Sequence, residues 1–143
     1  MTLSPCRLFL AYLAALLCFL LCDGCWITLT SSSLYQPAFG ALMAPEANWL
    51  AVGLFYPLFL YGLLVFAITP GLQQRAPLVA LRRGALLGLF AYATYDLTNQ
   101  ATLRDWPWSI TAIDMTWGTF VSGVASWAGT RLTSRRTSRT PAQ

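Results

Sequence analysis

Four long apolar stretches constrain this chain more than any other feature of its sequence. They cover residues 8–27, 49–69, 84–102 and 108–129, and each has roughly the 20 residues that an α-helix needs to cross a lipid bilayer. Only 10% of the residues are charged, against about a quarter in a soluble domain. The sequence therefore predicts an all-α, polytopic membrane protein, with four transmembrane helices in one domain over residues 1–130.

The arginines predict how these helices are oriented. With four spans, the N-terminus, the loop between the second and third helices and the C-terminal segment share one side of the membrane. That side carries eight of the nine basic residues, and the opposite side carries only Arg104. Cytoplasmic segments are enriched in Arg and Lys, so both termini are expected in the cytoplasm. Residues 131–143 are predicted to form a basic, disordered cytoplasmic tail.

Composition also excludes several classes of function. Histidine is absent, which removes His-ligated haem, most zinc sites and the usual general base, so we predict no metal site and assign no cofactor. The net charge of +4 comes from arginines at helix ends and in the tail. Topology explains their placement, and we expect the lipid bilayer rather than nucleic acid as the partner. Cys22 and Cys25 form a C-x-x-C in an apolar helix, where we interpret them as small buried hydrophobes.

The first apolar stretch has a competing interpretation as a cleaved signal peptide, because Arg7 precedes it. No small-x-small cleavage site follows the stretch, and Asp23 and Trp26 stand where cleavage would occur. We therefore expect an uncleaved helix. Thr28–Asn48 is then predicted to be a loop, with a short helix lying in the membrane interface.

Three aspartates interrupt the apolar pattern at a similar depth. Asp96 and Asp114 each lie nine residues from Asp105, the middle of the turn between the third and fourth helices. An antiparallel hairpin places them level, about 9 Å inside the helix ends, and Asp23 lies about 6 Å inside the same end of the first helix. Since a charged residue costs about 2.5–3.5 kcal/mol at the centre of a membrane helix, neighbouring groups must solvate or neutralise these carboxyls.

A second pattern predicts how the third and fourth helices pack. The third helix carries a G-x-x-x-G at Gly84 and Gly88. The fourth carries a row of mostly small residues spaced by four, namely Asp114, Gly118, Ser122 and Ser126. Reflection about Asp105 pairs Gly88 with Ser122 and Tyr92 with Gly118. Because small residues let helix backbones approach closely in lipid, we expect these two rows to face each other.

Polar and aromatic side chains at the depth of the aspartates form the predicted site, a carboxylate-lined polar pocket in the outer half of the membrane. The candidate binding residues are Asp23, Trp26, Tyr92, Tyr95, Asp96, Asn99, Thr111, Asp114 and Trp117. A structural interpretation is also open, in which the aspartates are protonated or hydrogen-bonded to Tyr, Thr and Asn as contacts between helices. Three carboxyls at one level favour the functional interpretation, and Arg104 at the turn is placed to pair with one of them.

The polar segments also carry a resemblance. The run ATYDLTN at residues 93–99, the Trp106-Pro107 turn and the element Asp-Met-Thr-Trp-Gly at 114–118 resemble a family of small bacterial membrane proteins of unknown function. The Asp-x-x-Trp at 23–26 and the segments 48–49 and 55–56 match the same family, over about residues 8–130. The resemblance implies four helices in a bacterial inner membrane, and it implies no established activity.

Three functions fit these features. In the first, the carboxylate pocket binds or transports a proton, a cation or a small solute, since intramembrane carboxylates commonly mark such paths. Four helices enclose little volume, so transport would require a homodimer. Alternatively, two carboxyls act as acid and base in a lipid-modifying enzyme, although no nucleophile elbow, HExxH or phosphate loop is present and no catalytic residue is assigned. The third alternative is an accessory subunit of a larger membrane complex. We favour binding or transport.

Overall fold

The computed structural model describes residues 3–136, and every regular element within this range is helical. The α-helices are α1 (Pro5–Thr30), α2 (Gln36–Phe39), α3 (Trp49–Leu63), α4 (Thr69–Gln73), α5 (Pro77–Thr102) and α6 (Trp108–Arg136). Two π-helical segments, η1 (Ser31–Tyr35) and η3 (Leu64–Ile68), join α1 to α2 and α3 to α4, and the 3-10 turn η2 (Gly40–Leu42) follows α2. The predicted all-α class is confirmed.

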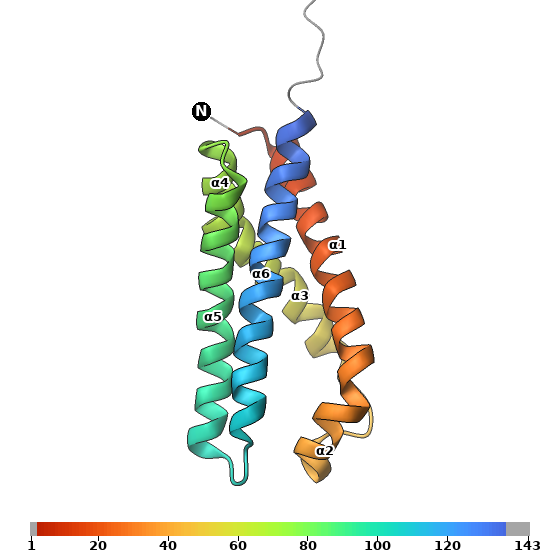
Figure 1. Cartoon of the computed structure of the whole chain (residues 1–143). Coiled ribbons are helices and arrows are strands. Elements are labelled where there is room, and N and C mark those ends of the chain that lie inside the picture. The colour runs from red at the N-terminus through yellow and green to blue at the C-terminus, as the bar shows by residue number, and fades with distance from the viewer. Residues whose placement is uncertain (1–2, 137–143) are drawn as a thin grey trace, which may run out of the picture.

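The long helices form an elongated bundle. Figure 1 shows α5 and α6 side by side along their length, with α1 against α6 and α3 crossing the bundle obliquely. The start of α1, the connection from α4 to α5 and the end of α6 lie together at one end, whereas α2 and the turn between α5 and α6 lie at the other. Asp105 takes a positive φ of 60° in that turn, which allows the chain to reverse within a few residues.

Two of the four predicted spans pass a test of length and composition. Within the described residues, the helical stretches Pro5–Phe39 and Trp49–Gln73 are long and apolar enough to cross a membrane. The helices α5 and α6 are long enough but less apolar, because they carry aspartates, arginines and many Ser and Thr residues along their length. The first and second predicted spans therefore meet this criterion, and spanning by α5 and α6 stays a prediction.

The helices extend beyond the segments predicted from the sequence. The helical path of α1 continues through η1 and α2 to Phe39, where a loop was expected from Thr28 onward. The hydroxyls of Thr28, Thr30 and Ser33 donate to backbone carbonyls four residues earlier, so these polar residues do not end the helix. At the other terminus, α6 runs to Arg136, into the predicted tail, and residues 137–143 lie outside the described part of the chain.

The contact between α5 and α6 follows the predicted register. A Cβ added to Gly88 would lie 2.5 Å from the Oγ of Ser122, and a Cβ added to Gly84 would lie 2.7 Å from the Cβ of Ser126. The ring of Tyr92 lies directly against Gly118. These pairs match the reflection about Asp105, and the predicted packing is confirmed.

A continuous apolar core joins α1 to α3 and α6. Its fully buried residues include Phe19 from α1, Leu60 and Leu63 from α3, and Val121 from α6. Of the two cysteines of the C-x-x-C, Cys22 is half-buried and packs against this core, whereas Cys25 is exposed on α1. The interpretation of both as buried hydrophobes is wrong for Cys25, which lies on the outward face of the helix.

Candidate binding site

A cavity of about 380 Å³ lies between α1, η1, α3, α5 and α6, and Phe39 of α2 also lines it. Most of the predicted site residues line it: Asp23, Trp26, Tyr92, Tyr95, Asp114 and Trp117. We call this cavity the carboxylate pocket. The lining holds two carboxyls and no arginine, so its charged side chains are all acidic.

Asp23 is held by donors from two other helices. The indole Nε1 of Trp117 on α6 donates to its Oδ1 at 3.0 Å, and the hydroxyl of Tyr56 on α3 donates to its Oδ2 at 2.6 Å. The residue is only 6% exposed. A buried carboxyl needs hydrogen bonds to offset its lost hydration, and here each oxygen has a donor. Asp23 therefore links α1 to both α3 and α6.

Asp114 has a different environment. The Tyr35 hydroxyl from η1 donates to its Oδ1 at 2.5 Å, and the indole Nε1 of Trp26 donates to the same Tyr35 oxygen at 3.0 Å. Within residues 3–136, the Oδ2 of Asp114 accepts no hydrogen bond, and it is not among the fully enclosed polar atoms. Because Asp114 lines the carboxylate pocket, this oxygen is the one acidic group there that is free to contact a ligand.

A stacked pair of tryptophans is hydrogen-bonded to both carboxyls, directly or through a tyrosine. Trp26 and Trp117 stack with ring centroids 4.4 Å apart and planes 10° from parallel. Each tryptophan follows an aspartate by three residues, in Asp23-x-x-Trp26 and Asp114-x-x-Trp117. Trp117 bonds the aspartate of α1 directly, and Trp26 reaches the aspartate of α6 through a tyrosine. The repeated motif thus joins the two antiparallel helices in a reciprocal contact.

Aromatic side chains form most of the remaining wall. The further aromatic residues that line the carboxylate pocket are Tyr35, Phe39, Phe55, Tyr56, Tyr92 and Tyr95. Aromatic rings present a negative face, which attracts a positively charged group placed over them. Carboxylates and aromatic faces therefore favour the same sign of ligand charge.

The structure does not bring the other three predicted residues into the carboxylate pocket. Asp96 is fully buried outside its lining. Asn99 lines an adjoining cavity of about 610 Å³ near the loop that follows α2. Thr111 belongs to a separate network, in which it accepts from the Nε1 of Trp106 at 3.2 Å and donates to the Oε1 of Gln100 at 3.1 Å. These hydrogen bonds connect the end of α5 to the start of α6 across the turn.

Sequence reasoning missed Tyr35 and Tyr56, although each donates to one of the aspartates. Tyr56 lies seven residues from the start of α3 at Trp49, about 10 Å into the helix, and a comparison of depths would have placed it near Asp23. No such signal exists for Tyr35, because it lies in the segment that was expected to be a loop. Among the described residues, no group of three or more potential metal ligands occurs.

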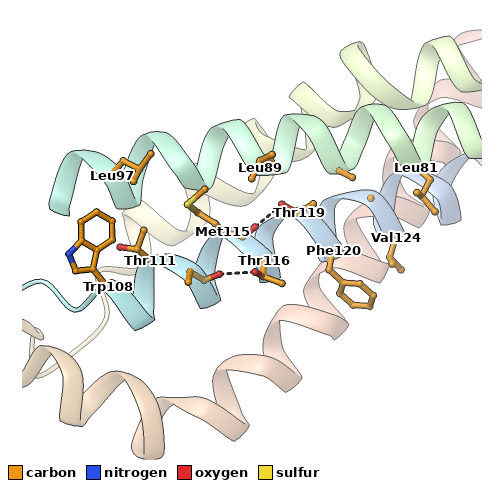
Figure 2. A pocket seen from close by; sticks show the side chains of 13 residues that line it. Leu81, Leu89, Leu97, Trp108, Thr111, Met115, Thr116, Thr119, Phe120 and Val124 are labelled. Atoms are coloured by element: carbon orange, nitrogen blue, oxygen red, sulfur yellow. Dashed lines mark hydrogen bonds between the residues drawn. The ribbon is translucent and has the colours of Figure 1, made fainter. Parts of the chain in front are cut away.

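A larger cavity lies elsewhere and is lined mainly by apolar residues. It is a groove of about 880 Å³ along α5 and α6, lined by residues such as Leu89, Met115 and Phe120 (Figure 2). The hydroxyls of Thr116 and Thr119 in this groove donate to carbonyls of their own helix, both at 2.7 Å. None of its lining residues is titratable. The groove offers apolar contact alone, and the carboxylate pocket is the better candidate site.

Comparison with known proteins agrees that the chain is a membrane protein. A sequence profile for a family described as "Predicted membrane protein (DUF2177)" matches residues 8–131. No curated protein and no solved structure matches the chain. The match covers most of the sequence, including both Asp-x-x-Trp motifs and the ATYDLTN run. The chain therefore belongs to this family of predicted membrane proteins, for which no function is established.

Proposed function

We propose that this chain is a four-span protein of a bacterial inner membrane that binds a small organic cation in the carboxylate pocket, as a step in transporting it. Both termini are cytoplasmic, and the pocket lies in the outer half of the membrane. The observation that carries the proposal is the lining itself: two carboxyls, eight aromatic side chains and no arginine around about 380 Å³.

The arrangement of donors supports a cationic ligand. Asp23 already accepts a hydrogen bond at each oxygen, so it contributes negative charge rather than a free acceptor. Asp114 keeps one oxygen free and supplies the direct contact. Cation–π attraction adds about 0.5–1 kcal/mol per favourable ring at exposed sites and more where water is excluded. A compact organic cation uses both kinds of group, whereas an inorganic ion would leave most of the aromatic wall unused.

The distribution of arginines supports the orientation. The start of α1, the α4–α5 connection with the first turns of α5, and the end of α6 lie at one end of the bundle (Figure 1), and they carry Arg7, Arg75, Arg82, Arg83 and Arg131. The positive-inside rule assigns that end to the cytoplasm. The weak hydropathy of α5 and α6 is compatible with spanning, because α6 buries Ser122 and Ser126 against the glycines of α5.

Reporter fusions test the topology. A reporter after Gln143 and one within residues 74–76 should report the cytoplasm, and one within the non-helical segment 43–47 should report the outside. If residues 43–47 and Gln143 report the same side, the four-span arrangement is wrong.

Tryptophan fluorescence tests the ligand class. The purified protein in detergent is titrated with tetramethylammonium chloride, with sodium chloride at the same ionic strength and tert-butanol as charge and shape controls. We expect saturable quenching by tetramethylammonium alone. Asp114→Asn should weaken this binding at least tenfold, whereas Asp105→Asn, in the exposed turn, should leave it unchanged. Equal responses to tetramethylammonium and tert-butanol would show that charge is not recognised.

A further inference from the structure

Asp96 is the acidic residue of the bundle that the proposed function leaves unused. It is 0% exposed, and neither of its carboxyl oxygens has a hydrogen-bond partner within residues 3–136. Native proteins pair the great majority of their buried polar groups, so an unpaired buried carboxyl calls for an explanation. Asp23 and Asp114, by contrast, both have aromatic donors.

The register between α5 and α6 places Asp96 beside the carboxylate pocket. Contacts join Gly84 to Ser126, Gly88 to Ser122 and Tyr92 to Gly118, and each pair is symmetric about the turn at Asp105. The next pair in this series is Asp96 and Asp114. The same register therefore brings Asp96 to the level of Asp114 on the facing helix.

The surroundings of Asp96 favour its neutral, protonated form. An ionised carboxylate that is buried without hydrogen bonds is so costly that such a group usually keeps its proton. The titratable groups that interact with it are both acidic: Asp114 on α6 and Tyr95 on its own helix. Asp23 and Tyr35, which interact with Asp114, are acidic as well. Arg104, the arginine at this end of the bundle, lies exposed in the turn.

A cation in the carboxylate pocket would change this balance. With Asp96 protonated, Asp23 and Asp114 account for the negative charge of the site. A bound cation neutralises one of these charges and so removes much of the repulsion that opposes ionisation of Asp96. The binding of the cation and the release of the proton are then coupled, and such coupling is reciprocal.

We infer that Asp96 carries a proton which the protein releases when a cation binds at Asp114, so that the site exchanges one proton for one cation. This inference rests on the proposed function. The O–H bond of Asp96 breaks, its electron pair stays on the carboxylate, and the proton passes to bulk water. One positive charge enters the site as another leaves, so its total charge is conserved. Asp96 acts here as a coupling residue that does not touch the ligand.

Proton release on binding provides the direct test. Wild-type protein in weakly buffered detergent solution is titrated with tetramethylammonium chloride while a pH-indicator dye follows the solution. We expect up to about one proton released per bound cation, and an affinity that rises with pH by at most about tenfold per pH unit. Asp96→Asn should bind the cation without releasing a proton, with an affinity that no longer depends on pH.

Two further variants keep the test decisive. Asp96→Glu retains a carboxyl and should retain proton release, and Asp105→Asn should behave as wild type. Circular dichroism and thermal unfolding establish which variants are folded. If wild type binds the cation without releasing a proton, or if folded Asp96→Asn releases as many protons as wild type, the inference is wrong while the proposed function stands. If wild type binds no cation, the proposed function itself fails.

Discussion

The contacts of α6 with α5 and with the pocket end of α1 are built in opposite ways. Toward α5 it presents Gly118, Ser122 and Ser126, and the backbones approach so closely that Gly84 and Gly88 have no room for a Cβ. On the other side, Trp117 donates to Asp23 at the end of α1, Asp114 accepts from Tyr35 of η1, and these side chains line a cavity. One helix thus forms a tight, ligand-free contact on one side and a binding site on the other.

The helices on the two sides of this comparison also differ in hydropathy. Only 22% of the residues in the most apolar stretches of Pro5–Phe39 and Trp49–Gln73 are buried within the protein. Most of their side chains are therefore at least partly exposed to the surroundings. The α5–α6 pair is less apolar, and its buried polar residues face inward, among them Asp96, Ser122, Ser126 and Thr130. Apolar helices shield the bundle from lipid, and the less apolar hairpin carries the rigid packing. This division predicts that stability depends most on the hairpin and ligand binding most on the pocket side.

Gly88→Leu should break the hairpin and have the largest effect. A Cβ at this position meets the backbone carbonyl of Gly118 as well as Ser122, and a backbone cannot rotate away as a side chain can. Overpacking typically costs about 1–3 kcal/mol, and a rigid backbone neighbour places this substitution at about the upper value. The free energy of unfolding, from thermal or denaturant unfolding in detergent, gives the comparison with wild type.

Gly53→Leu is the matched control. Gly53 also lies inside a helix, α3, but a Cβ there would have no atom within 4 Å. The variant should unfold within about 0.5 kcal/mol of wild type, as surface substitutions usually do. Equal losses for the two glycine variants would mean that the α5–α6 contact is not the stabilising element that we describe.

The packing of α5 against α6 could be predicted from the sequence because the two helices are adjacent in the chain and joined by a short turn. A short turn at Asp105 fixes the register, and spacing by four then identifies Gly88 with Ser122 and Tyr92 with Gly118 without knowledge of any other helix. The level of Asp96 and Asp114 follows from the same count. Helix geometry and the position of the turn are therefore enough to predict how α5 and α6 pair.

The pocket could be predicted only in part, because its bonds join segments distant along the chain. Tyr35 reaches Asp114 only because the helical path continues beyond Thr30, and polar Ser31–Ser33 gave no signal of that. Spacing also cannot show which side chains are exposed to a cavity: Asp96 lies on the predicted row, yet it is fully buried and does not line the cavity that Asp114 lines. The repeated Asp-x-x-Trp was visible in the sequence, but the stacking of its tryptophans was not.

Trp117→Phe should have an intermediate effect on stability and a clear one on binding. It removes the indole donor to the Oδ1 of Asp23, a contact that averages about 0.6 kcal/mol within membranes, and weakens an aromatic stack worth about 0.5–1.5 kcal/mol. It also disturbs the stack with Trp26, so quenching by tetramethylammonium should require a higher concentration. Trp127→Phe, on the same helix and 39% exposed, is the control and should change neither quantity. If the two variants behave alike, Trp117 does not anchor the pocket.

Tyr35→Phe and Tyr56→Phe should have the smallest effects on stability and should distinguish the two aspartates. Each removes one hydroxyl donor and keeps the ring, and side-chain hydrogen bonds within membranes average about 0.6 kcal/mol in double-mutant cycles. Tyr61→Phe, whose side chain is 60% exposed on α3, is the control. Tyr35 bonds the aspartate that keeps a free oxygen, and Tyr56 bonds the aspartate that is already fully paired. Loss of the Tyr35 hydroxyl therefore misplaces the ligand-contacting carboxyl and should weaken tetramethylammonium binding more than loss of the Tyr56 hydroxyl, although both variants unfold at nearly the same free energy. The reverse order of affinities would make Asp23, and not Asp114, the residue that contacts the cation.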